Sequence, residues 1–119
     1  MDKRSLGRFG EQQAAEYLRK KGYNIIKMNF FCRAGEIDVI AEDKNYIVFA
    51  EVKLRKNADH GEAREFVTAA KQRRIIKTAQ LWLCAHENVK QPRFDVIEVY
   101  APDGERGRVK VNHIEDAFM

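Results

Sequence analysis

Apolar and polar residues alternate most clearly along residues 35–53 of the chain. The segments Gly35–Glu42 and Tyr46–Lys53 both alternate with a period of two, which is typical of β-strands. Only residues 43–45 separate them, which is the length of a tight turn. The pattern therefore predicts two antiparallel strands joined as a hairpin.

The register of this hairpin gives its two faces different characters. If the turn is centred between Lys44 and Asn45, the numbers of opposite residues add up to 89. Three pairs then share a wholly apolar face: Ile37 with Val52, Val39 with Ala50, and Ala41 with Val48. A turn with an odd number of residues would shift the register and break this pairing.

The opposite face of the hairpin carries charge. In the same register Asp38 opposes Glu51, and Glu36 opposes Lys53. Directly opposed side chains lie about 5 Å apart, so the two carboxylates repel each other. A divalent cation between Asp38 and Glu51 is the best explanation for a hairpin that keeps this pairing. The alternative is a surface hairpin with a Glu36–Lys53 ion pair and an exposed pair of acids.

The rest of the chain predicts two helices, three further strands and a loop. The helices run from about Gly7 to Lys21, ending at Gly22, and from about Glu65 or Thr68 to Ala85; the strands are Tyr23–Phe31, Pro92–Tyr100 and Arg108–Ile114; the loop is Asn57–Glu62. The order is therefore α-β-β-β-α-β-β. Because a helix between strands permits a parallel crossover, we expect an α/β fold with a central mixed sheet flanked by helices. The apolar residues 117–119 are expected to dock on this core.

Polar residues lie on the expected buried faces of both helices. Glu11 lies three and seven residues before Ala14 and Leu18, which belong to the apolar stripe of the first helix. Glu11 is therefore expected to face the core, although a frayed helix end that reaches water explains its position equally well. In the second helix the core stripe, extended backwards, meets Lys71 and Gln72.

The length and composition set the class of protein. A chain of 119 residues and 13.9 kDa predicts a single domain over residues 1–119. No apolar run approaches the roughly 18 residues of a membrane span, and the first residues lack the apolar segment of a secretory signal. We therefore expect a cytoplasmic protein with no membrane partner. In that compartment Cys32 and Cys84 are expected to be buried thiols, and the three histidines lack the spacing of a zinc site.

Positive charge is concentrated in one segment. The whole chain has a net charge of +4, whereas residues 53–77 contain eight bases and three acids, a net charge of +5. A solvated helix face is the ordinary explanation of such a run. Its position directly after the acidic hairpin favours nucleic acid as the partner, with Arg55, Arg73 and Arg74 among the residues expected to contact phosphates.

Several short motifs carry a resemblance to known nucleases. They are Gly10-Glu11, Gly35-Glu36-Ile37-Asp38, Glu51-Val52-Lys53, Arg93-Phe94-Asp95-Val96 and Ala117-Phe118. Over nearly its full length the chain resembles the small bacterial YraN-like family, which is similar to the archaeal Holliday junction resolvases. Both belong to the PD-(D/E)xK superfamily, whose core is a helix, three strands, a helix and a strand. Ile37 stands where the superfamily name has proline.

This resemblance implies a restriction-endonuclease-like fold and an endonuclease that hydrolyses phosphodiester bonds in DNA, at branched or junction structures. Asp38, Glu51 and the main-chain carbonyl of Val52 would hold Mg²⁺ or Mn²⁺. Lys53 would orient or help to deprotonate the attacking water. Glu11 would reach the metal through water or assist a second ion.

The resemblance also implies further contacts and leaves one alternative open. Lys71 and Gln72, at the start of the second helix, would touch the scissile phosphate. Because one copy of this size covers few base pairs, action on two strands favours a homodimer. The alternative is a nucleic-acid-binding module that keeps the nuclease core without useful activity.

Overall fold

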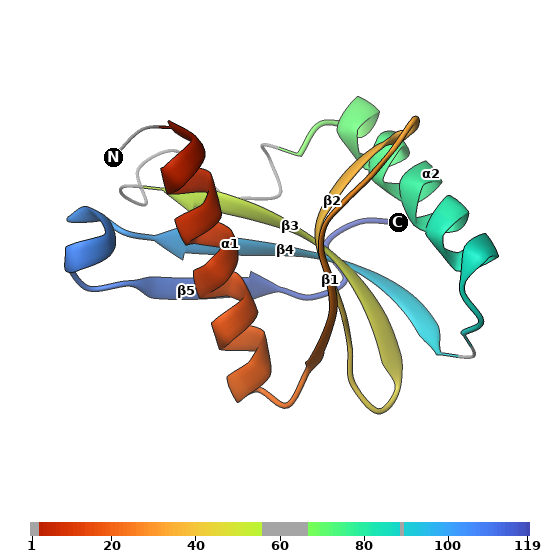
Figure 1. The fold of residues 1–119 in the computed structure, drawn as a ribbon, viewed down its shortest axis with the longest axis horizontal. Helices are drawn as coiled ribbons and strands as arrows, with labels where there is room; N and C mark the ends of the chain where they lie inside the picture. The colour runs from red at the N-terminus through yellow and green to blue at the C-terminus, as the bar shows by residue number, and fades with distance from the viewer. Residues whose placement is uncertain (1–2, 56–66, 89) are drawn as a thin grey trace.

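The computed structural model describes residues 3–55, 67–88 and 90–119, so the predicted loop 57–62 lies outside the described residues. Figure 1 shows the order α-β-β-β-α-β-β, which confirms the prediction. The elements are α1 (Lys3–Lys20), β1 (Asn24–Cys32), β2 (Gly35–Glu42), β3 (Tyr46–Arg55), α2 (Ala69–Ala85), β4 (Gln91–Tyr100), the 3-10 helix η2 (Gly104–Arg106) and β5 (Lys110–Ile114). Helix α1 begins at Lys3 instead of Gly7, and β5 begins at Lys110 instead of Arg108.

The five strands form one mixed sheet in the order β1-β2-β3-β4-β5. The central neighbours β3 and β4 run parallel, because α2 carries the chain back between them. The other neighbouring strands are antiparallel. The predicted mixed sheet flanked by helices is therefore confirmed, in an arrangement consistent with a restriction-endonuclease-like core.

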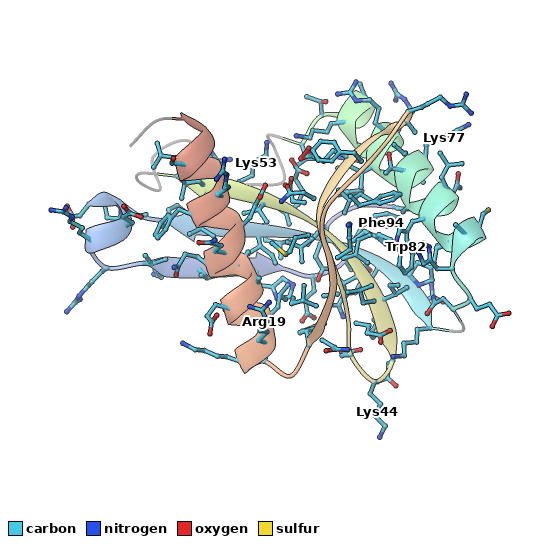
Figure 2. The ribbon with its side chains drawn as sticks, viewed as in Figure 1. Arg19, Lys44, Lys53, Lys77, Trp82 and Phe94 are labelled. Carbon is cyan, nitrogen blue, oxygen red and sulfur yellow. The ribbon has the colours of Figure 1, made fainter. Side chains whose placement is uncertain are left out.

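Each face of the sheet is buried under one helix. Helix α1 packs in a cluster that contains Ala14, Leu18, Val39, Ala41, Val48, Ala50, Ile97 and Val99. Helix α2 packs in a cluster that contains Ile37, Ile40, Ile47, Phe49, Ile75, Ala79, Trp82, Phe94 and Val96. Figure 2 shows Trp82 and Phe94 between α2 and the sheet. Neighbouring residues such as Val39 and Ile40 enter opposite clusters, as the period of a strand requires.

The hairpin keeps its predicted register only in part. Val39 opposes Ala50, as expected, but the regular β2–β3 pairs end there. At the next position Asp38 Oδ2 accepts a hydrogen bond of 2.8 Å from the backbone N–H of Val52, so a side chain replaces a main-chain partner. Ile37 was predicted to share a face with Val39, yet it packs in the α2 cluster instead. The break in the ladder at Asp38 accounts for this change of side.

The ends of both helices have ordinary causes. Helix α1 stops before Gly22, whose φ of +96° suits a residue without a Cβ atom. Helix α2 begins after Thr68, whose hydroxyl accepts a hydrogen bond of 3.1 Å from the Lys71 N–H, so the second of the two predicted starts is confirmed. This cap fixes the first turn of α2, where Lys71 lies.

The chain end and the cysteines complete the comparison with the sequence. Phe118 docks by stacking on Phe94, with 5.4 Å between ring centroids, whereas Met119 is exposed. Both cysteines are free, but Cys32 is partly exposed and Cys84 is exposed, so the expectation of buried thiols is wrong. Cys32 lies at the end of the edge strand β1, where the sheet gives little cover. No helix among the described residues is long and apolar enough to cross a membrane.

Candidate functional site

Acidic side chains from three elements meet where β2 and β3 part. Glu11 comes from α1, Glu36 and Asp38 from β2, and Glu51 from β3. One carboxylate oxygen from each of Glu11, Glu36 and Asp38 lies within 4.8 Å of the other two. Oxygen ligands at this density suit a hard divalent cation such as Mg²⁺ or Mn²⁺, so these acids could hold a metal ion.

Helix α1 delivers Glu11 from its interior. The helix begins at Lys3, so Glu11 does not lie at a frayed end, and that alternative is wrong. Glu11 is partly buried and continues the stripe formed by Ala14 and Leu18. The neighbouring Gly10 lets α1 approach β3 closely, since a Cβ atom there would lie 3.3 Å from the Cβ of Leu54.

Asp38 and Glu51 line one cleft of about 180 Å³ between β2, β3 and α2. Glu51 is buried, with 5% of its surface exposed, and Asp38 is partly buried. The two carboxyls lie close enough for the charge of Asp38 to act on Glu51. The alternative of an exposed acidic pair on a surface hairpin is therefore wrong.

The cleft disfavours negative charge. Burial raises the pKa of Asp38 to about 6, and the nearby Glu11 charge adds to this. Burial and the Asp38 charge raise the pKa of Glu51 to about 7. Burial likewise raises the pKa of Glu11, with further contributions from Glu36 and Glu51. Positive charge in the cleft would offset the repulsion among these carboxylates and the cost of burying them.

Two lysines supply part of that charge. Lys53 Nζ lies 3.9 Å from Glu51 Oε1, and burial together with the Lys71 charge lowers the pKa of Lys53. Lys71 Nζ forms a shorter ion pair with the same Glu51 oxygen. Burial lowers the pKa of Lys71, but its hydrogen bond to Glu51 outweighs that effect and leaves the pKa raised. The alternative of a surface hairpin paired Lys53 with Glu36, whereas the ion pair formed is with Glu51.

The remaining predicted contacts divide into residues near the cleft and residues directed elsewhere. Arg74 is exposed and lines the cleft, and Arg73 is exposed on the adjoining surface of α2. Gln72 Nε2 donates a hydrogen bond of 2.9 Å to the Val67 carbonyl, so its side chain stabilises the start of α2. Arg55 Nε lies 3.1 Å from Glu98 Oε2. A role of the Val52 carbonyl as a metal ligand stays a prediction.

The sequence analysis missed Glu36 as a member of the acidic group. Glu36 was given no role in the metal site, but its carboxylate lies with those of Glu11 and Asp38. The signal was its spacing of two residues from Asp38, which in a regular strand predicts that both acids share one face. Glu36 was not proposed as a metal ligand because the pairing argument considered only residues directly opposed across the hairpin.

Comparisons with known proteins place the chain in a family. The model of the uncharacterised protein family UPF0102 matches residues 10–99. A UPF0102 protein of Caldanaerobacter subterraneus is 49% identical over 120 residues, covering 99% of this chain and 98% of that protein. A UPF0102 protein of Symbiobacterium thermophilum is 47% identical over 116 residues, covering 97% of each chain. All four acids of the site lie within the matched residues.

Proposed function

The chain belongs to the uncharacterised protein family UPF0102, and we propose that it is a metal-dependent nuclease that hydrolyses phosphodiester bonds in DNA. One observation carries the proposal: the acids of β2 and β3 line a cleft, the Glu11 carboxylate of α1 lies beside them, and Lys53 and Lys71 form ion pairs with Glu51. Carboxylates that hold a cation, next to a lysine that can act on water, are the groups that phosphodiester hydrolysis needs.

The residues present fit a divalent cation. Asp38 and Glu51, with the main-chain carbonyl of Val52, would hold Mg²⁺ or Mn²⁺, and Glu11 and Glu36 would add oxygen ligands or hold its water. When bound, such an ion would stabilise the negative charge that develops on a phosphoryl group. The raised pKa values of Asp38 and Glu51 support this assignment, because burial and mutual repulsion outweigh the lysines that contact Glu51.

Lys53 is the residue best placed to act on the attacking water. Its ammonium group lies at the edge of the cleft, and its lowered pKa favours proton exchange. In the view of Figure 2, Lys53 projects from β3 beside α1, the helix that carries Glu11. Lys71 and Arg74 lie on the α2 side, where they would bind the oxygens of the phosphate.

The choice of DNA rests on charge and on resemblance. Arg73, Arg74 and Lys77 are exposed along α2 next to the cleft, where they would neutralise phosphates. The preference for branched or junction DNA comes from the likeness to the resolvases noted above. Action on both strands of such a substrate would require two copies of the chain, so we include a homodimer in the proposal.

One observation favours the second candidate function, a nucleic-acid-binding module without useful activity. The Lys71 ammonium already pairs with Glu51, so an internal cation partly occupies the place of the metal. A permanent pair of this kind would exclude the ion, whereas a pair that opens would deliver Lys71 to the phosphate. Replacing Lys71 by Met separates the two cases, because the metal affinity rises only if the lysine excludes the ion.

The test of the nuclease proposal is the separation of cleavage from binding in Lys53→Ala. Single-turnover cleavage of labelled linear, single-stranded, flapped and four-way DNA is measured in Mg²⁺ or Mn²⁺, and binding is measured in Ca²⁺. We expect a loss of at least about 10²-fold in cleavage, the scale of a lost proton-transfer or oxyanion-stabilising group. Binding should change little, because one lysine is a small part of a footprint over many phosphates.

The matched control is Lys44→Ala. Lys44 is an exposed lysine in the β2–β3 turn, and Figure 2 shows it at the far end of the molecule from Lys53. This variant should cut as fast as the parent protein. A parent that binds every DNA form and cuts none contradicts the nuclease proposal and favours the binding module.

A further inference from the structure

We propose that Phe31 is a base-stacking residue, so that the preferred substrate carries an unpaired base next to the cleaved phosphate. This inference rests on the proposed nuclease function and adds to it the class of substrate. Phe31 is 69% exposed, the most exposed aromatic side chain in the described part of the chain. Exposure of this apolar ring to water is unfavourable, so a partner that covers the ring would gain free energy.

The register of the sheet places Phe31 beside the acids. Phe31 of β1 directly opposes Glu36 of β2. Opposed residues of an antiparallel pair point to the same face with Cβ atoms about 5 Å apart. The carboxylate of Glu36 in turn lies within 4.8 Å of those of Glu11 and Asp38. Phe31 is therefore the direct cross-strand neighbour of Glu36, one member of the acidic group.

The tip of the β1–β2 hairpin also borders a basic groove. Figure 1 shows this tip beside the first turns of α2, and a Cβ atom on Gly35 would lie 3.1 Å from the Thr78 hydroxyl. Ala34 of the tip and Arg73, Arg74 and Lys77 of α2 line a groove of about 440 Å³. Arg74 lines the acidic cleft as well, so the groove and the cleft adjoin.

An exposed aromatic ring next to Glu36, on a hairpin whose tip lies against the arginines of α2, fits one strand of nucleic acid. The arginines would bind the phosphates that lead to the cleft, and the ring would carry the base of one nucleotide along that path. Stacking on an aromatic side chain accepts any base but requires that the base is free of its own duplex neighbours. Single strands, flaps and the open centre of a branch offer such a base, whereas an uninterrupted duplex does not.

The experiment compares binding of parent, Phe31→Ala, Phe31→Trp and Leu81→Ala in Ca²⁺. Leu81 is the control, since it is an exposed large apolar residue of α2 outside both the cleft and the groove. Fluorescence anisotropy is measured with three DNAs: a 20-nucleotide single strand, the blunt duplex of that strand, and the same duplex carrying a flap. Thermal melting of each variant confirms its fold, which an exposed residue at a hairpin tip should not alter.

We expect Phe31→Ala to bind the single strand and the flap about 5- to 100-fold more weakly, the range measured for loss of one base–aromatic stack. Its affinity for the blunt duplex should stay within about twofold of the parent, Phe31→Trp should restore binding, and Leu81→Ala should match the parent. Equal affinities of parent and Phe31→Ala for all three DNAs overturn the inference. A protein partner would then explain the exposed ring, while the nuclease proposal stands. A parent that binds no DNA overturns both.

Discussion

The sheet contains two buried groups of charged residues, and the pKa values of their acids are shifted in opposite directions. Asp95 of β4 is fully buried, and Arg93 donates to it from Nε at 2.9 Å and from Nη2 at 2.8 Å. His113 Nε2 lies 2.6 Å from Asp95 Oδ2, and the Asp116 N–H donates at 3.0 Å to Oδ1. Burial raises the pKa of Asp95, but these hydrogen bonds outweigh it and leave the pKa lowered.

The acids of the cleft lack this internal compensation. Asp38 accepts one backbone hydrogen bond, and Glu51 meets the lysines, yet burial keeps both pKa values raised. The Asp95 network is complete without a ligand, so its charges stabilise the fold. The cleft becomes electrostatically stable only when a proton or an external cation enters. This difference separates a structural buried acid from a functional one.

The largest expected effect comes from breaking the complete network. Asp95→Asn should destabilise the protein by about 3–5 kcal/mol, because it leaves the buried Arg93 without its countercharge. The measurement is the free energy of unfolding in urea. Glu115→Gln is the control, since Glu115 is exposed and its carboxylate lies 3.8 Å from the same guanidinium. A change below about 1 kcal/mol in the control is expected, and an equally small change in Asp95→Asn would contradict the assigned role.

The cleft should respond in the opposite direction when one of its acids is neutralised. In EDTA, Asp38→Asn should be more stable than the parent by about 1–2 kcal/mol at pH 8, since a shift of one pKa unit corresponds to about 1.4 kcal/mol and solvent screens part of it. An asparagine can still accept the hydrogen bond from Val52. At pH 4 both proteins hold a neutral side chain here, so their free energies of unfolding should be close.

The sign follows from the direction of each pKa shift. Asp38 and Glu51 have raised pKa values, so their protonated forms favour the fold, and stability is lost as the pH rises toward about 6 and about 7. The lowered pKa of Asp95 gives the opposite slope, with stability lost as the pH falls through it. If the free energies of unfolding of the parent and of Asp38→Asn changed in parallel from pH 4 to 8, the destabilising charge assigned to Asp38 would be contradicted.

The smallest expected effect concerns the basic surface of α2 next to the cleft. Removing Arg73 and Arg74 together should reduce the magnitude of the log–log salt slope of DNA binding by about 2, if both touch phosphates. The control removes Arg19 and Lys20, two exposed bases in the last turn of α1. A slope unchanged by the first pair and reduced by the second would place the nucleic-acid face on α1.

The fold was predictable because it follows local periodicity. The alternation of residues 35–53 and the helical stripe through Leu18 are enough to order the elements, since both periods report which faces are buried. Those same patterns predicted that Asp38 would oppose Glu51 and that Glu11 would face the core, whereas the meeting of Glu11 with the other two acids was implied only by the resemblance. Each lies on an element whose buried face was already defined by its apolar neighbours.

The rest depends on contacts that no local pattern reports. The partners of Asp95 come from Arg93 in the same strand, from β5 and from the turn after β5, so the sequence of β4 alone gave no sign of a network. The Gln72 side chain is directed to the Val67 carbonyl beside the cap of α2, and Arg55 forms its ion pair with Glu98 of β4. The pairing rule for hairpins likewise missed Glu36, because the ladder breaks at Asp38.

The most direct test of the central claim, that the cleft is a divalent cation site built on Asp38, is the melting temperature of parent and Asp38→Asn as Mn²⁺ is added at pH 7.5. A ligand that binds only the native state stabilises it by about 2.7 kcal/mol at a concentration of 100 Kd. The account predicts a saturable rise for the parent and for Glu16→Gln, an exposed acid of α1 outside the cleft, and little or no rise for Asp38→Asn. Equal rises in all three proteins would contradict it.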